Sequence, residues 1–95
     1  MAATMFVRHK VNDYTTWKSI YDGLGLIRKQ NGVTTSSVHR DANDPNIIII
    51  THQFKDMTAA TGFANSGELK SAMGKAGVSG PPEFWFSEDI ERTPF

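Results

Sequence analysis

The stretch Ile47-Ile48-Ile49-Ile50-Thr51-His52-Gln53-Phe54 decides the fold of this 95-residue chain. Isoleucine is β-branched and stiff, so four isoleucines in a row predict a strand. Successive strand residues point to opposite faces of a sheet, which places Ile47 and Ile49 on one face and Ile48 and Ile50 on the other. A sheet with one face in water alternates apolar and polar residues, and this run does not. We therefore expect both faces of this strand to be covered, one of them by something outside the chain.

The composition is that of one ordinary globular domain spanning residues 1–95. Lysine and arginine equal aspartate and glutamate in number, so no excess charge points to nucleic acid or to an anionic membrane. The chain has no cysteine, which excludes disulfides, thiolate metal sites and a cysteine nucleophile. No apolar run approaches the roughly 20 residues of a membrane span, and the first residues lack the pattern of a signal peptide. We expect a cytoplasmic protein without a membrane partner.

Before the isoleucine run the chain reads as strand, helix, strand. Thr4–Val11 alternates in polarity, with His9 on the same face as three apolar residues. Asn12-Asp13 offers a helix cap, and Asn31-Gly32 offers a stop. Between them apolar residues recur at steps of three and four, which predicts one amphipathic helix weakened at Gly23 and Gly25 by about 1 kcal/mol each. Its apolar stripe is Tyr14, Trp17, Ile20, Tyr21, Leu24 and Ile27.

Val33–Asp41 predicts a second strand, and the turn at 42–46 joins it to the isoleucine strand as a hairpin. If Asp41 lies opposite Ile47, then His39 faces Ile49 and Ser36 faces His52. A bulge in the turn would reverse this assignment. In the pairing of the first and third strands, we expect His9 near Ile49 and His52 near Phe6, about 10 Å apart.

After the isoleucine run the chain predicts a broken helix and a last strand. The helix begins near Met57, is interrupted at 65–67, where Ser66 can cap a second segment, and ends near Gly77. Residues 77–82 read as a rigid glycine- and proline-rich loop. Residues 83–90 form the last strand, with Phe84 and Phe86 on one face and Trp85 on the other.

The predicted order β-α-β-β-α-β is an α+β, ferredoxin-like arrangement. Right-handed crossovers then give a four-stranded antiparallel sheet with two helices on one face. The other face would carry Phe6, Ile47, Ile49 and Trp85, a larger apolar patch than monomers usually expose. A second copy packed sheet against sheet is the simplest cover, so we expect a homodimer, with His39 at its interface or on the surface.

Three segments resemble a known family: His9–Trp17 with the sequence HKVNDYTTW, Phe63–Met73 with FANSGELKSAM, and Ala76–Pro82 with AGVSGPP. The chain resembles, over essentially its whole length, the small stand-alone proteins of the dimeric α/β-barrel superfamily, which includes antibiotic-biosynthesis-monooxygenase-like domains. The resemblance implies a dimeric α/β barrel with a ligand cavity between helices and sheet. It also implies a homodimer that binds a small molecule, an aromatic or polyketide-like compound. If the protein is an enzyme, the resemblance implies a cofactor-independent monooxygenase, a cyclase or an isomerase.

The candidate catalytic residues are His52 and His9, because histidine titrates near neutrality and each shares its predicted face with apolar neighbours. The alternative is that each is a core or rim histidine with its hydrogen bonds satisfied, for example His52 by Ser36. We expect no metal or haem, since about 10 Å separates the two imidazoles. The candidate substrate-binding residues are Trp17, Tyr21, Phe63 and Phe84, which suit a flat apolar compound, and Arg28, which suits an anion.

Two other functions fit the same sequence. One is a non-catalytic ligand-binding or stress-related dimer, in which the cavity only holds a metabolite. The other is a structural dimer with a filled core. The presence of a cavity between sheet and helices separates this last interpretation from the others.

Overall fold

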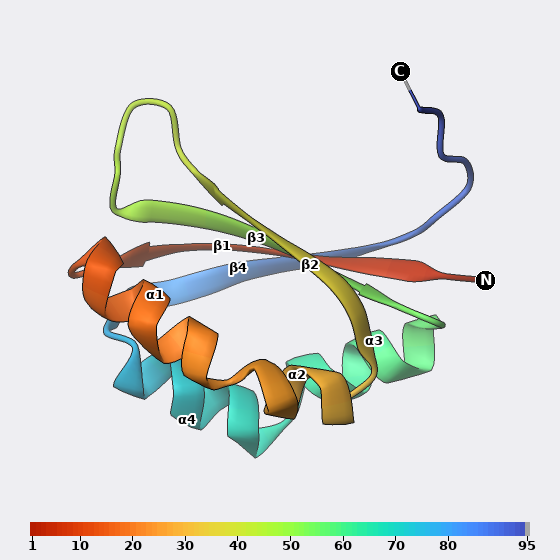
Figure 1. The fold of residues 1–95 in the computed structure, drawn as a ribbon, viewed down its shortest axis with the longest axis horizontal. Helices are drawn as coiled ribbons and strands as arrows, with labels where there is room; N and C mark the ends of the chain where they lie inside the picture. The colour runs from red at the N-terminus through yellow and green to blue at the C-terminus, as the bar shows by residue number, and fades with distance from the viewer. Residues whose placement is uncertain (95) are drawn as a thin grey trace.

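A computed structural model describes residues 1–94 of the chain. Its four strands form one antiparallel sheet in the order β2-β3-β1-β4, and all helices cover one face of it (Figure 1). This confirms the predicted α+β, ferredoxin-like fold, with each of the two helical connections divided into two helices. The elements are β1 (Ala3–Val11), α1 (Tyr14–Gly23), α2 (Gly25–Gln30), β2 (Val33–Arg40), β3 (Ile47–Phe54), α3 (Met57–Ala64), α4 (Gly67–Lys75) and β4 (Val78–Glu88).

The helices α1 and α4 begin at the capping residues that the sequence indicates. The Asp13 carboxylate accepts a hydrogen bond from the backbone N–H of Thr16, and the Ser66 hydroxyl accepts one from that of Leu69. The expectation of a single first helix was wrong, because α1 ends at Gly23 and α2 starts at Gly25. Two glycines so close together, each unfavourable in a helix interior, break the helix at Leu24 rather than merely weakening it.

The hairpin of β2 and β3 has the predicted register: His39 pairs with Ile49, and Ser36 pairs with His52. Its irregularity lies at the far end, between Val33 and Thr35, and not in the turn. The predicted pairs between β1 and β3 were wrong by one residue, since His9 pairs with Ile48. Residues directly opposite each other in a sheet point to the same face, so His9 points to the helix-covered face together with Ile48.

The expectation of a loop over residues 77–82 was also wrong, because β4 runs through most of it. Val78 pairs with Val11 and Ser79 with Lys10, but the next pair is Glu83 with Arg8. The intervening segment, 80–82, is therefore a bulge opposite His9. Proline lacks the N–H that a ladder needs, and the edge position of β4 tolerates this. The left-handed turn at Gly80, with φ of +77°, suits a residue without a side chain.

The core lies between the sheet and the helices. From β3 it takes Ile48, Ile50 and Phe54, each at most 2% exposed, and from the helices it takes Trp17 and Phe63. The remaining core residues are Ala3, Met5, Val7, Val11, Ala60 and Ala76. Among residues 1–94 no helix is long and apolar enough to cross a membrane.

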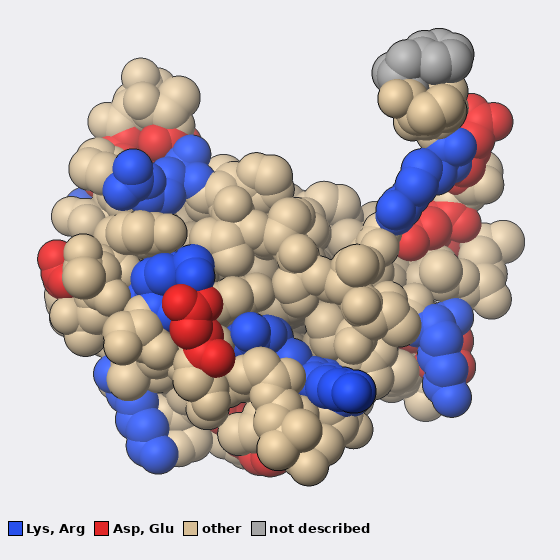
Figure 2. Space-filling view, viewed as in Figure 1, with Lys and Arg blue, Asp and Glu red and all other residues tan. Residues whose placement is uncertain are grey.

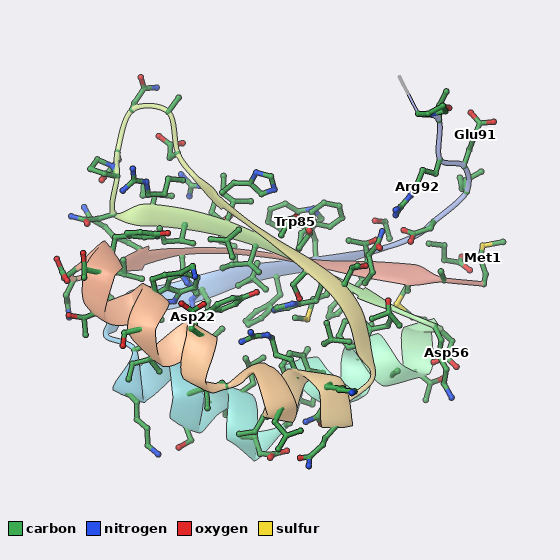
Figure 3. The ribbon with its side chains drawn as sticks, viewed as in Figure 1. Met1, Asp22, Asp56, Trp85, Glu91 and Arg92 are labelled. Atoms are coloured by element: carbon green, nitrogen blue, oxygen red, sulfur yellow. The ribbon has the colours of Figure 1, made fainter. Side chains whose placement is uncertain are left out.

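The other face of the sheet has no helical cover. Phe6 and Trp85 stack on it with ring centroids 5.4 Å apart, and Trp85 is 44% exposed. Figure 3 shows Trp85 on the side of the sheet opposite the helices. Figure 2 shows that this side is concave and largely free of charge between the tip of the β2–β3 hairpin and the C-terminal arm. We call this surface the open face.

Candidate functional site

A cavity lies between the helix-covered face of the sheet and α1, α2 and α4. The space inside it that water-sized groups could fill measures about 70 Å³. It brings together six of the seven residues that the sequence singled out: His9, Trp17, Tyr21, Arg28, His52 and Phe63. The rest of its lining is apolar, from Val7, Ile20, Leu24, Ile27, Ile50, Leu69, Ala72, Met73 and Ala76. The cavity is the feature that separates a binding protein from a structural dimer with a filled core.

His52 projects from the centre of β3 into this cavity and is 5% exposed. Its Nδ1 atom is 2.7 Å from the hydroxyl of Ser36, the residue that pairs with it on β2. The ring of Tyr21 lies nearly parallel to the imidazole at 6.5 Å, and the ring of Phe63 meets it edge-on at 5.7 Å. The imidazole is thus held on three sides, and Nε2 is the nitrogen left for a ligand.

His9 lines the same cavity from β1 and is 6% exposed. Neither of its ring nitrogens has a hydrogen-bond partner among the described residues. The indole of Trp17 packs against the imidazole at 5.7 Å, and the bulge of β4 lies opposite it. Buried polar atoms are nearly always paired, so an imidazole without partners that faces a cavity indicates a polar ligand atom or a water molecule there.

Both histidines are neutral at pH 7. Burial lowers the pKa of His9 to about 4, because a charged imidazolium would lose its hydration. Burial also lowers the pKa of His52 to about 4, and the positive charge of Arg28 adds to this effect. Each imidazole can therefore accept a proton from a bound acid, and it accepts one more readily when the product is an anion beside it.

Arg28 supplies the charge of the cavity. Its guanidinium lies 3.7 Å from the centroid of the Tyr21 ring, and Nη1 donates a hydrogen bond of 2.6 Å to the Tyr21 carbonyl. That carbonyl also accepts the backbone N–H of Leu24 at the end of α1, and its second lone pair receives the guanidinium. No aspartate or glutamate belongs to the cavity lining. A cation stacked on an aromatic ring beside neutral imidazoles suits a planar anion.

The structure does not bring Phe84 to this cavity. Phe84 lies on the helix-covered face as predicted, opposite Val7 on the neighbouring strand, but it lines a separate surface hollow beside α4. The two histidines are farther apart than expected, because His9 pairs with Ile48 and His52 pairs with Met5. Four strand positions correspond to about 13 Å. Among residues 1–94 no group of three or more histidine, aspartate or glutamate side chains is placed to hold a metal ion.

The contribution of α4 to the cavity was not predicted. Leu69, Ala72, Met73 and Ala76 lie on the apolar stripe that the sequence indicates for this helix. The stripe shows which residues turn inward, but it does not show which of them leave a space. His39 lies outside the cavity: it is exposed on the open face, and its Nε2 is 3.1 Å from the Ser37 hydroxyl.

No protein-family model matches the chain, and no curated protein matches its sequence. Solved structures match it in fold. One is SnoaB from Streptomyces nogalater, a cofactor-independent oxygenase, with a TM-score of 0.77 at 12% identity over 99% of this chain and 98% of that one. Another is a candidate antibiotic biosynthesis monooxygenase from Caulobacter crescentus, with a TM-score of 0.75 at 14% identity over 95% and 91%.

A third match is NE2512 from Nitrosomonas europaea, a protein of unknown function, with a TM-score of 0.76 at 15% identity over 97% of this chain and 92% of that one. At such identities the likeness concerns the fold, not the reaction. The matches span nearly the full length of each of these chains. The chain therefore has the fold of the antibiotic-biosynthesis-monooxygenase-like proteins, as the segments around His9, Phe63 and Ala76 suggested.

Proposed function

We propose that the protein binds in the cavity a planar aromatic compound with an acidic CH₂ group that a ring carbonyl activates, and acts on this compound by removing a proton. The observation that carries this proposal is the meeting of two buried neutral imidazoles with one guanidinium inside an apolar, aromatic wall. Aromatic side chains supply the contact area for a flat ring, and a few polar groups orient it.

In this proposal His52 is the base and Arg28 stabilises the anion. The Nε2 atom of His52 takes the proton of the substrate, while Ser36 holds Nδ1 at 2.7 Å and so fixes the ring. The resulting imidazolium and Arg28 lie on the same side of the cavity as the new negative charge. His9, whose nitrogens lack partners among the described residues, hydrogen-bonds a second polar group of the substrate.

The reaction that fits this arrangement is oxygenation by molecular oxygen. A CH₂ group flanked by aromatic rings and activated by a ring carbonyl loses a proton to His52 and becomes an electron-rich carbanion. This carbanion reacts directly with O₂, one oxygen atom is retained as a new C=O, and the other leaves as water with the two hydrogens of the CH₂. The substrate itself supplies the electrons, so the proposal needs no metal or flavin. Support comes from the fold of SnoaB, which is a cofactor-independent oxygenase.

The test measures oxygen uptake with anthrone, a tricyclic compound with such a CH₂ group. We expect His52→Ala to lower kcat at least about 100-fold, in the range of general-base catalysis, and His9→Ala to have a smaller effect. His39→Ala is the matched control, because His39 lies on the open face, and it should stay within about twofold of wild type. Unchanged turnover in the His9→Ala, His52→Ala double variant would sink the proposal. Saturable binding without turnover would leave a protein that only holds its ligand.

We also propose that the protein is a homodimer through its open face. The apolar half of this face carries Phe6, Ile47, Ile49 and Trp85, none of which the helices cover. Burying each such side chain contributes roughly 1.5–3 kcal/mol, which favours a second copy over water as the cover. A two-fold axis brings the same concave surface of Figure 2 to both sides of the contact.

A further inference from the structure

A second hollow lies next to the cavity, on the other side of α4. It measures about 320 Å³ and runs between α4 and the beginning of β4. Figure 1 shows α4 below the sheet, followed directly by β4 at the sheet edge. We call this hollow the outer groove. Its lining is Ala64, Leu69, Lys70, Met73, Val78, Gly80, Pro82 and Phe84, so Lys70 is its one charged residue.

Two side chains belong to both spaces. Leu69 and Met73 line the cavity on one side and the outer groove on the other, one helical turn apart on α4. They are therefore the partition between the two. Methionine is unbranched and has three rotatable bonds, so Met73 can change rotamer at little cost. No residue within α4 is buried, and its C-cap, Ala76, is the one buried position at that end of the helix.

The cavity by itself is small for the function proposed above. Ligand sites usually measure about 300–1,000 Å³, several times the 70 Å³ of the cavity. The outer groove next to it measures about 320 Å³. Gly80, on the bulge of β4, lines this groove, and nothing lies within 4 Å of where its Cβ would stand.

We infer that the cavity and the outer groove form one elongated ligand site, with Met73 as the gate between them. This inference rests on the proposed function. The occupant is a fused polycyclic aromatic anion of two or more rings: its acidic end lies beside Arg28 and His52, and its apolar end passes Met73 into the groove and contacts Phe84. Phe84 is then a ligand contact after all, at the distal end of the compound rather than in the cavity. Lys70 makes the mouth of the groove favourable for a polar or anionic substituent.

The test measures the affinity of the intact protein for benzoate, 2-naphthoate and anthracene-2-carboxylate by isothermal titration calorimetry. Wild-type affinity should rise at least tenfold from the one-ring to the three-ring probe. Met73→Trp closes the passage, so it should weaken anthracene-2-carboxylate at least tenfold more than it weakens benzoate. Ser71→Trp is the matched control, because it places the same side chain on an exposed position of the same helix, and both probes should bind it as they bind wild type.

Met73→Ala provides a second readout if the bulky variant does not fold. It removes most of the gate, so it should strengthen anthracene-2-carboxylate several-fold relative to benzoate. Equal effects of Met73→Trp on all three probes, or none on any, would overturn the gate. Its failure is distinguishable from failure of the proposed function: benzoate that binds wild type but not Arg28→Gln keeps the cavity as a site even if the groove is unused, whereas no binding of any probe removes both.

Discussion

Strand β3 places isoleucines on both faces of the sheet, and the two faces bury them to different extents. Ile48 and Ile50 point to the helices and are almost completely buried, while Ile47 and Ile49 point to the open face and are only half-buried. The helix-covered face continues into His52 and the cavity. The open face continues into Thr51 and Gln53, which bond to residues of β2.

One strand thus contributes to two different surfaces, the core beneath the helices and the open face. The covered face is complete within the chain, and its buried polar side chains are His9 and His52. The open face is incomplete: half of it is apolar and has no cover among residues 1–94. Substitutions on the covered face should therefore change folding and ligand binding, and substitutions on the open face should change assembly.

The largest expected effect is a loss of stability from a substitution on the covered face. Ile48→Ala leaves a cavity among fully buried neighbours and should lower the free energy of unfolding by about 4 kcal/mol. Ile47→Ala, one residue away on the open face, should cost less than half of that. Urea unfolding at a protein concentration low enough to keep the protein monomeric measures both. Equal losses there would mean that the chain itself covers both faces equally, contrary to the burial of the two side chains.

The next effect is a loss of dimerisation from a substitution on the open face. Ile49→Lys introduces a charge where we place the dimer contact, and it should weaken dimerisation about 100-fold, or about 3 kcal/mol. Sedimentation velocity across a range of concentrations gives the dissociation constant. Leu26→Lys is the control, because Leu26 is 66% exposed on α2 and lies away from the open face. A wild-type protein that is monomeric at micromolar concentration contradicts the dimer outright.

Between pH 6.5 and pH 4, acid should act on the covered face, because burial lowers the pKa of both His9 and His52 there. The pKa of His9 falls from an ordinary value of 6.5 to about 4 in the folded protein, so between these values the unfolded chain binds more protons. Stability is therefore complete above about pH 6.5 and is lost as the pH falls toward 4, by on the order of 2 kcal/mol for this group.

His9→Phe removes that titration, so it should reduce the loss of stability between pH 7 and pH 4. Thermal unfolding followed at a series of pH values measures the slope. His39→Phe is the control on the open face and should leave the slope as it is in wild type, because the His39 side chain is exposed. A slope that His9→Phe does not change would show that acid acts elsewhere.

The smallest effect compares two neighbouring serines. Ser36→Ala removes the hydroxyl 2.7 Å from His52 Nδ1, and it should cost about 1 kcal/mol and shift the ring resonances of His52 in an NMR spectrum. Ser37→Ala removes a hydroxyl of the open face that bonds to Thr51, and it should leave those resonances in place. Resonances of His52 that respond equally to both changes would contradict the separation of the two faces.

The local pattern of residues predicted most of the elements and their faces. The isoleucine strand, the caps at Asp13 and Ser66, and the pairing of Ser36 with His52 all depend on neighbours in the chain or across a tight hairpin. Six of the seven candidate site residues meet in one cavity because they lie on stripes that the periodicity of strand and helix already shows. The functional roles of those residues stay predictions.

What failed depended on contacts that are distant in sequence. The predicted β1–β3 pairing was wrong by one residue, because no tight turn sets the register of these two strands. Residues 77–82 were predicted as a loop because glycine and proline usually end strands, but β4 runs through most of this segment. An edge position in the sheet tolerates them, and that position follows only from the strand order. Phe84 was misplaced for the same reason, since α4 stands between it and the cavity.

By itself, the run of four isoleucines determined that one strand carries large apolar side chains on both faces, because successive side chains alternate across any strand. It could not determine what covers each face. The tertiary structure decided this for one face, which the helices cover and on which a cavity lies at His52 and His9; no part of residues 1–94 covers the apolar half of the other face. The physical reason is that alternation is a local property of the backbone, whereas a cavity and an uncovered face arise only where separate elements meet.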